Sequence, residues 1–177
     1  MRAPTPLNLA RLDLSDFSVL LIEDNAHMRR IIRMILTSIG VRTIVEAEDG
    51  AVALDIYSTS PPDLIITDWL MPIIDGIELT RRIRLDESTN GRFSPIIMIS
   101  AKSSKRDVIH ARDAGVTEFM CKPVSAKGLY LRIANAIGNP REFVRTKTFF
   151  GPDRRRFVNP HYNDSEKRHL SASGTGG

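Results

Sequence analysis

Short runs of β-branched and other apolar residues alternate along the chain with longer segments whose apolar residues recur at helical spacing. The short runs are continuously apolar rather than alternating, which is typical of strands covered on both faces and hence of a mainly parallel sheet. The five expected strands are 19–22, 41–45, 64–67, 96–99 and 116–121.

The clearest helix follows the first strand, with apolar residues at i, i+3, i+4, i+7, i+8 and i+11. We expect this helix to end at Gly40. Further helices are expected over 50–58, 75–85, 104–114 and 125–137. The helix at 104–114 has a thin apolar face, so we expect it to be the least firmly packed. Because strand and helix alternate five times and crossovers are right-handed, the pattern predicts an α/β fold with a (βα)5 doubly wound parallel sheet.

Composition and charge narrow the function. Apolar residues make up 42% and charged residues 26% of the 177 residues, as in a soluble globular protein. No run approaches the ~20 apolar residues of a membrane span, and the N-terminus lacks the apolar core of a signal peptide, so we expect a cytoplasmic protein with no membrane partner. The single Cys121 lies in a strand-like run and is expected to be a small buried hydrophobe rather than a redox centre.

Polar residues follow four of the expected strands. Glu23 and Asp24 come after the first strand, Asp68 after the third, Ser100 after the fourth and Lys122 after the fifth. Because ligands of open α/β sheets bind where the carboxyl ends of the strands emerge, we expect these side chains to converge at one edge.

The three acids at this edge repel one another unless a cation joins them. Oxygen ligands without a Cys/His cluster fit Mg²⁺ better than zinc. With Glu23 and Asp24 at the metal, Asp68 is placed as a nucleophile that attacks phosphorus to form an acyl phosphate. Lys122 would pair with the phosphoryl group, and Ser100 would donate a hydrogen bond to it.

Each of these residues has an ordinary alternative role. Asp24 or Asn25 could cap the first helix, Asp68 could be a turn residue, Ser100 could be an N-cap and Lys122 could be a solvated surface charge. Their joint appearance at successive strand ends favours the functional interpretation.

Four segments carry a family resemblance: "LLIEDNAHMRR", "PDLIITDWLMPIIDG", "PIIMISAK" and "FMCKP", in this order. They resemble the receiver domain of two-component response regulators, and the resemblance covers residues 17–138. It implies a flavodoxin-like fold with strand order 2-1-3-4-5. The chain is similar to a stand-alone receiver, with an N-terminal extension (1–16) and a basic, aromatic and partly disordered C-terminal tail (139–177).

The resemblance also implies roles. Asp68 is the phosphoacceptor, and the Mg²⁺ ligands are Glu23, Asp24, Asp68 and the backbone carbonyl of Leu70. Ser100 and Lys122 complete the site, and the Lys122–Pro123 peptide is expected to be cis. Family members take phosphoryl groups from a histidine kinase, a histidine phosphotransfer protein or a small phosphodonor and lose them by hydrolysis. We therefore expect this chain to phosphorylate and dephosphorylate itself and not to be an enzyme.

Phe119 occupies the position of the family's aromatic switch residue, although it is equally compatible with a plain core role. A nearly complete two-state switch needs ~5.5 kcal/mol of differential interaction. One hydrogen bond from Ser100 to a charged group supplies ~1.5 to 3 kcal/mol. Lys122, the metal and the repacking of Phe119 must therefore contribute the rest of the differential interaction energy.

Leu70, two residues beyond Asp68, is apolar where receivers often carry an amide or a charge. We hypothesise that it shields the acyl phosphate from water and prolongs its lifetime. The same residue argues against a phosphohydrolase of the haloacid dehalogenase type, because such enzymes need an acid at this position.

The tail holds the whole positive excess, with eight Lys/Arg against four Asp/Glu from Arg141 onward. Disordered segments are usually poor in aromatics, so Phe149 and Phe150 are expected to dock on the receiver or on a partner, with 151–153 as a turn. A solvated tail and, less favoured, single-stranded nucleic-acid binding through residues such as 154–156 are the alternatives. Because no output domain follows, we expect action through contact with an unknown downstream protein, and a phosphorelay intermediate or phosphate sink remains the alternative.

Overall fold

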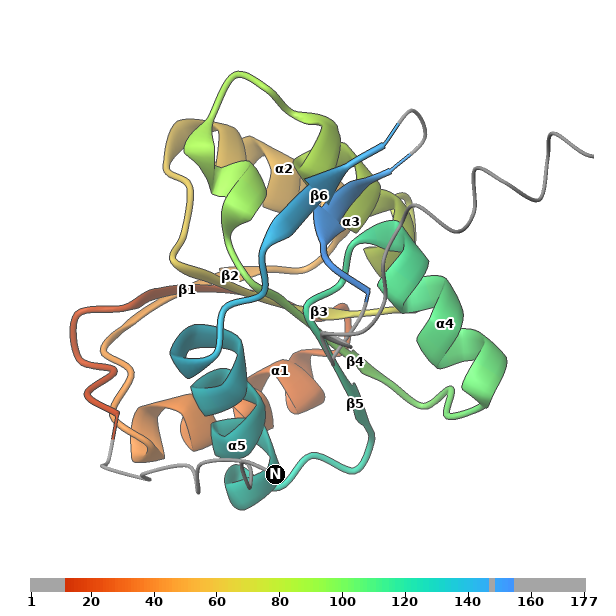
Figure 1. The fold of residues 1–177 in the computed structure, drawn as a ribbon. Helices are drawn as coiled ribbons and strands as arrows, with labels where there is room; N and C mark the ends of the chain where they lie inside the picture. The colour runs from red at the N-terminus through yellow and green to blue at the C-terminus, as the bar shows by residue number, and fades with distance from the viewer. Residues whose placement is uncertain (1–11, 147–148, 155–177) are drawn as a thin grey trace, which may run out of the picture.

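The computed structural model describes residues 12–146 and 149–154. Its centre is a five-stranded parallel sheet in the order β2-β1-β3-β4-β5 (Figure 1). Strands and helices alternate as β1 (Ser18–Ile22), α1 (Ala26–Ser38), β2 (Thr43–Ala47), α2 (Gly50–Thr59), β3 (Leu64–Asp68), α3 (Gly76–Leu85), β4 (Ile96–Ser100), α4 (Lys105–Ala114), β5 (Glu118–Cys121) and α5 (Ala126–Gly138). A short 3-10 helix, η1 (Asn90–Phe93), precedes β4. The predicted flavodoxin-like (βα)5 fold is confirmed.

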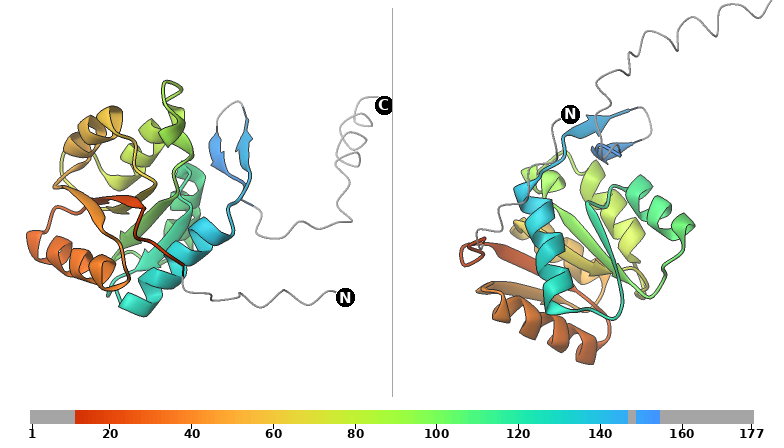
Figure 2. Two further views of the ribbon diagram at one scale, coloured as in Figure 1. Left: turned by 90° about the vertical axis from the view of Figure 1, so that its left-hand side faces the viewer. Right: turned by 60° about the horizontal axis from the view of Figure 1, so that its bottom comes forward.

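The helices form a layer on each face of the sheet. Helices α1 and α5 lie on one face, and α2, α3 and α4 lie on the other (Figures 1 and 2). Successive side chains of β1 contribute to the cores on opposite faces of the sheet. Leu21 packs on the side of α1 and α5, and Leu20 and Ile22 pack on the side of α2 and α3. This alternation of side chains along a strand builds one apolar core on each face.

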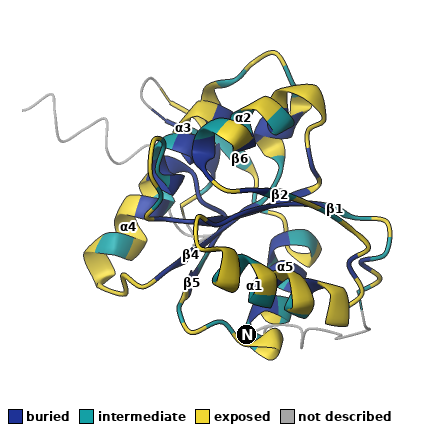
Figure 3. Cartoon of the chain, turned by 180° about the vertical axis from the view of Figure 1, so that it is seen from behind, coloured by how far each residue is buried: buried dark blue, intermediate teal, exposed yellow. Residues whose placement is uncertain are grey.

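Burial along the strands depends on their place in the sheet. Every residue of β3 and β4, the third and fourth strands of the order, is buried. The edge strand β2 instead alternates, with Thr43 exposed and Val45 42% exposed. The expectation of strands covered on both faces therefore holds at the centre of the sheet and was wrong for β2 (Figure 3 shows the burial).

Side-chain caps set where the helices begin. The Asn25 carboxamide accepts hydrogen bonds from the N–H groups of His27 and Met28, both at 3.0 Å, so Asn25 rather than Asp24 caps α1. Ser104 caps α4 in a capping box with Asp107. Asp24 and Ser100 are therefore not used as caps of α1 and α4.

Helix α4 is thinly packed, as predicted. Only Ala111 and Ala114 are buried along it, and Val108 is 40% exposed. No helix within the described residues is long and apolar enough to cross a membrane.

The chain beyond α5 forms an antiparallel hairpin of β6 (Phe143–Arg145) and β7 (Phe150–Pro152). The ring centroids of Phe143 and Phe150 lie 5.1 Å and 5.5 Å from that of Phe93 in η1. The contact of Phe150 with Phe93 confirms the prediction that this aromatic residue docks on the receiver. Phe149 is also buried. The predicted turn at 151–153 was wrong, because Gly151 and Pro152 pair with β6 as a strand. Residues 155–156 of the arginine triplet lie outside the described part of the chain.

A buried arginine joins the hairpin to the receiver. The guanidinium of Arg84, on α3, donates to the carbonyl oxygens of Gly115 at 3.0 Å, Arg92 at 2.6 Å and Ser94 at 2.8 Å. It also lies 5.1 Å from the ring centroid of Phe143. Burial lowers the pKa of Arg84 to about 9, so the group remains a cation at neutral pH.

The single cysteine lies at the surface. Cys121 is the last residue of β5, the other edge strand, and it is exposed. The expectation that it is a buried hydrophobe was wrong, because an edge strand is covered less completely than its central neighbours.

Candidate functional site

Three carboxylates meet at the carboxyl ends of β1 and β3. Glu23 and Asp24 follow β1, and Asp68 is the last residue of β3, its neighbour in the sheet. One oxygen from each carboxylate lies within 4.8 Å of the others. Glu23 and Asp68 are buried whereas Asp24 is exposed, so the group opens to solvent on one side. The predicted convergence of the acids is therefore present.

Lys122 reaches the same group from the end of β5. Its ammonium lies 2.9 Å from Glu23 Oε2 and 3.3 Å from Asp68 Oδ1. The Lys122–Pro123 peptide is cis, as the resemblance implied. Lys122 therefore joins the predicted site through direct ion pairs.

Burial and charge perturb the titration of the site. Burial raises the pKa of Glu23 against the hydrogen bond from Lys122, and the charge of Asp68 raises it further. Burial likewise raises the pKa of Asp68, although the charge of Lys122 works in the opposite direction. Burial works to lower the pKa of Lys122, but the hydrogen bond to Glu23 and the charge of Asp68 outweigh it and raise the value. One ammonium leaves two net negative charges among the three carboxylates, which fits a further cation.

Ser100 ends β4, and its Cα pairs with that of Cys121 across the sheet. The side chain is fully buried, and its hydroxyl oxygen accepts the N–H of Lys102 at 3.0 Å. Because β3 and β4 are neighbours, with Asp68 opposite Ile99, the structure brings Ser100 to the strand end beside the carboxylates.

The backbone after Asp68 is packed too tightly for any side chain at Gly76. The N–H of Gly76 donates to the carbonyl of Trp69 at 2.9 Å. A Cβ atom at Gly76 would lie 2.2 Å from the carbonyl oxygen of Asp68. The hydroxyl of Thr67 donates to the same oxygen at 2.8 Å. These contacts hold the loop that carries the carboxylate.

Trp69 was not among the predicted site residues, yet it adjoins Asp68 and is only 3% exposed. Its ring meets the rings of His110 and Phe119 edge-on, with centroids 5.5 Å and 6.2 Å away. The ammonium of Lys102 lies 4.5 Å from the Trp69 ring centroid. Trp69 thus links the acidic group to α4 and to the predicted switch residue. A lone Trp after an acid gave no sequence signal, because its burial depends on α4.

The remaining predicted residues have less defined surroundings. Phe119 is half-buried on β5 and packs against the cluster around Trp69. The side chain of Leu70 is 54% exposed at the rim of the site. The roles of the Leu70 carbonyl as a metal ligand and of Phe119 as a switch stay predictions.

The donor set suits a hard divalent cation. Glu23, Asp24 and Asp68 each offer a carboxylate oxygen, the kind of ligand that Mg²⁺ prefers. The exposed Asp24 leaves room for the waters that Mg²⁺ retains. With such a cation bound, the Asp68 carboxylate would lie between the metal and the Lys122 ammonium, 3.3 Å from its Oδ1.

Comparisons with known proteins agree with this geometry. The family model of the response regulator receiver domain matches residues 19–134. The chain is 35% identical over 114 residues to chemotaxis protein CheY-3 of Vibrio cholerae, covering 64% of this chain and 86% of that protein. It is 36% identical over 115 residues to chemotaxis protein CheY of Pseudomonas aeruginosa, covering 65% of this chain and 91% of that protein.

Among solved structures, the chain resembles the receiver domain of the sensor histidine kinase PA1611 from Pseudomonas aeruginosa PAO1. The TM-score is 0.64 at 31% identity, and the match covers 71% of this chain and all of that one. That receiver holds a magnesium ion in its active-site cleft. The residues that the family model matches, 19–134, include both strand ends that carry the carboxylates, and the chain belongs to the response regulator receiver domain family.

Proposed function

We propose that this receiver is a Mg²⁺-dependent phosphorylation switch in which Asp68 accepts a phosphoryl group from the phosphohistidine of a histidine kinase or of a histidine phosphotransfer protein. The observation that carries the proposal is the placement of Asp68. Its carboxylate lies at a strand end with Glu23 and Asp24 within 4.8 Å and the Lys122 ammonium 3.3 Å away.

Each step of the proposed reaction has a residue for it. A carboxylate oxygen of Asp68 attacks phosphorus, the P–N bond to the donor imidazole breaks, and the imidazole leaves with the electron pair. Glu23, Asp24, Asp68 and the Leu70 carbonyl would hold Mg²⁺, which neutralises the phosphoryl oxygens when bound. Lys122 moves from its carboxylate partners to a phosphoryl oxygen, and the Ser100 hydroxyl donates to another. Water later hydrolyses the acyl phosphate and regenerates Asp68.

The chain then signals by changing its surface. Phe119 contacts Trp69, the residue after the phosphoacceptor. Phe119 belongs to β5, the edge strand that lies between α4 and α5 (Figure 1). A change at Ser100 and Lys122 repacks Phe119 and alters this surface for a downstream protein. The proposal describes a switch that modifies itself rather than an enzyme that converts a separate substrate.

The test is phosphorylation of the full chain by acetyl phosphate with and without Mg²⁺, followed by mass spectrometry. We expect a gain of one phosphoryl group in the presence of Mg²⁺, located by peptide mapping to Asp68, and no gain in Asp68→Asn. Asp55→Asn is the matched control, because Asp55 is an exposed carboxylate on α2. Phosphorylation that persists in Asp68→Asn at the wild-type level would refute the assignment.

A further inference from the structure

The peptide unit that joins Glu23 to Asp24 is held by a residue outside the acidic group. The guanidinium of Arg29, on α1, donates to the backbone carbonyl of Glu23 at 2.7 Å. The N–H of Glu23 donates to the carbonyl of Ala47, the last residue of β2, at 3.2 Å. Glu23 is therefore fixed through both of its backbone polar groups.

Arg29 is itself anchored to the sheet by Glu46 of β2. Its Nε lies 3.1 Å from Glu46 Oε2, and the other carboxylate oxygen of Glu46 accepts from Arg33 at 2.6 Å. The side chain of Arg29 is 18% exposed, whereas that of Arg33 is 50% exposed. Arg29 therefore connects β2 to the loop after β1, while Arg33 adds only a surface ion pair, which contributes little to stability.

The orientation of this peptide unit affects the position of the Asp24 carboxylate. Asp24 is exposed, in contrast to the buried Glu23 and Asp68, so packing does little to fix its side chain. Its N–H belongs to the same peptide unit as the carbonyl that Arg29 holds. A rotation of that unit would move the Asp24 side chain relative to Glu23 and Asp68, whose carboxylate oxygens lie within 4.8 Å of its own.

We propose that Arg29 is a positioning residue, which fixes the geometry of the acidic group so that it favours Mg²⁺ over a larger divalent cation. Mg²⁺ requires nearly ideal octahedral coordination at short distances, whereas Ca²⁺ accepts longer and more variable ligand arrangements. A fixed peptide between two of the carboxylates therefore benefits Mg²⁺ more than Ca²⁺. The inference rests on the proposed function in one respect, that the acidic group takes Mg²⁺.

Two other roles for Arg29 predict different results. A purely electrostatic role has the opposite sign, because a cation beside the acidic group repels any metal ion, and its removal would strengthen the binding of both metals. A role limited to bracing α1 against β2 through Glu46 would change the stability of the fold but not the metal affinity of the folded protein.

The experiment titrates the isotope-labelled full chain with magnesium chloride and, separately, with calcium chloride in the absence of a phosphodonor. The amide NMR shifts of Glu23, Asp24 and Asp68 report metal binding. In Arg29→Met the affinity for Mg²⁺ should fall about tenfold or more, as is usual when a group that orients a metal ligand is removed. The affinity for Ca²⁺ should fall clearly less.

Two further variants make the same test on a less disturbed fold. Arg29→Lys keeps the charge and one donor group but not the planar fork that reaches both Glu23 and Glu46, so its affinity for Mg²⁺ should be intermediate. Glu46→Gln removes the anchoring charge of Arg29 and should change the affinities in the same direction. Amide shifts far from the site show whether each variant is folded.

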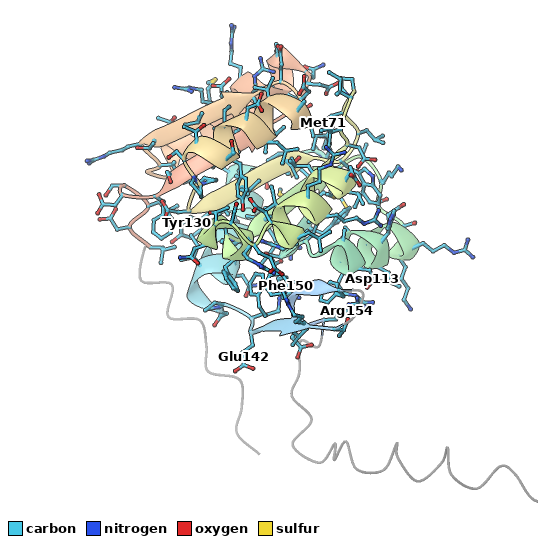
Figure 4. All side chains as sticks on the ribbon, turned by 90° about the horizontal axis from the view of Figure 1, so that it is seen from above. Met71, Asp113, Tyr130, Glu142, Phe150 and Arg154 are labelled. Carbon is cyan, nitrogen blue, oxygen red and sulfur yellow. The ribbon has the colours of Figure 1, made fainter. Side chains whose placement is uncertain are left out.

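The matched control is Arg33→Met, which removes one charge and one ion pair with Glu46 from the same helix but no contact with Glu23. A second control is Arg154→Gln. Figure 4 shows Arg154 well apart from Met71, which lies in the loop after Asp68. Both controls should bind Mg²⁺ and Ca²⁺ as the wild type does.

The outcomes separate the inference from the proposed function. Unchanged Mg²⁺ affinity in Arg29→Met and Arg29→Lys, an equal fall for the two metals, or stronger binding of both would overturn the positioning role. Each of these results leaves Mg²⁺ binding by the wild type intact. A wild-type chain that binds no Mg²⁺ would overturn the proposed function and the inference together.

Discussion

Arg84→Met tests whether a buried guanidinium holds the turn after α4 to the segment before β4. Arg84 is 1% exposed and donates to three backbone carbonyls, those of Gly115, Arg92 and Ser94, at 2.6 to 3.0 Å. These carbonyls belong to the turn after α4 and to the segment before β4. Methionine retains much of the aliphatic packing but supplies no donor, so the acceptors lose their partner.

The magnitude follows from two opposed contributions. Hydrogen bonds from a charged donor contribute about 1.5 to 3 kcal/mol each, so three of them represent about 5 to 9 kcal/mol. Removing the cation recovers a desolvation cost of several kcal/mol. The expected net loss in the free energy of unfolding of Arg84→Met is about 2 to 4 kcal/mol.

The assay is urea unfolding followed by the fluorescence of Trp69, the single tryptophan of the sequence. With an m-value of ~2 kcal/mol/M, the midpoint should fall by about 1 to 2 M. The control is Arg82→Met on the same helix, whose side chain is 51% exposed and pairs with Glu78 at the surface. That change should cost at most about 0.5 kcal/mol. Equal midpoints for the two variants would refute the reasoning.

Three further predictions concern the site and α4. Gly76→Ala should destabilise the fold by about 2 kcal/mol or more and reduce phosphorylation, because its Cβ would lie 2.2 Å from the Asp68 carbonyl oxygen. The control Gly138→Ala, whose Cβ would have nothing within 4 Å, should change neither the free energy of unfolding nor the phosphorylation in the same assays. Leu70→Asn should shorten the phosphoryl lifetime, measured as loss of phosphorylated protein over time, and an unchanged or longer lifetime would contradict shielding. The Ser104 hydroxyl lowers the pKa of Asp107, so the ionised cap stabilises the first turn of α4 above the ordinary carboxyl pKa and is lost as pH falls through the lowered value. Amide NMR shifts of that turn should therefore change between roughly pH 5 and pH 2, and a flat profile would contradict the capping box.

The sequence predicted the elements well because the information was local. The periodic apolar stripe and the Asn25 cap mark α1 without any distant contact. The strand starts were less accurate: β2 begins at Thr43 rather than at Val41, although Val41 is buried. A buried apolar residue looks the same to sequence analysis whether it pairs in a sheet or only packs beneath it.

The convergence at the site was predictable for a topological reason. Parallel strands place their carboxyl ends at one edge, so residues at the carboxyl ends of β1, β3 and β5 had to come together once the order was known. That arrangement allows the Lys122 side chain to reach Asp68 across the end of β4. The roles of the same residues in phosphoryl transfer rest on the proposed function.

Features that depend on distant contacts were not predicted. The hairpin is held in place by ring contacts of Phe143 and Phe150 with Phe93, which lies more than 45 residues earlier in the chain. Arg84 appears in the sequence as an ordinary surface charge on an amphipathic helix, and its burial depends on the carbonyls after α4 and before β4. Aromatic content indicated that the tail docks but not how.

The exposure of Cys121 gives the protein a built-in spectroscopic pair. The sequence contains one cysteine and one tryptophan. The thiol lies in solvent at the end of β5, and the indole is buried beside Asp68. A maleimide-linked acceptor dye at Cys121 would therefore be excited by energy transfer from Trp69 in the otherwise native chain, and it would report movement of the sheet edge relative to the acidic site without any engineered label position.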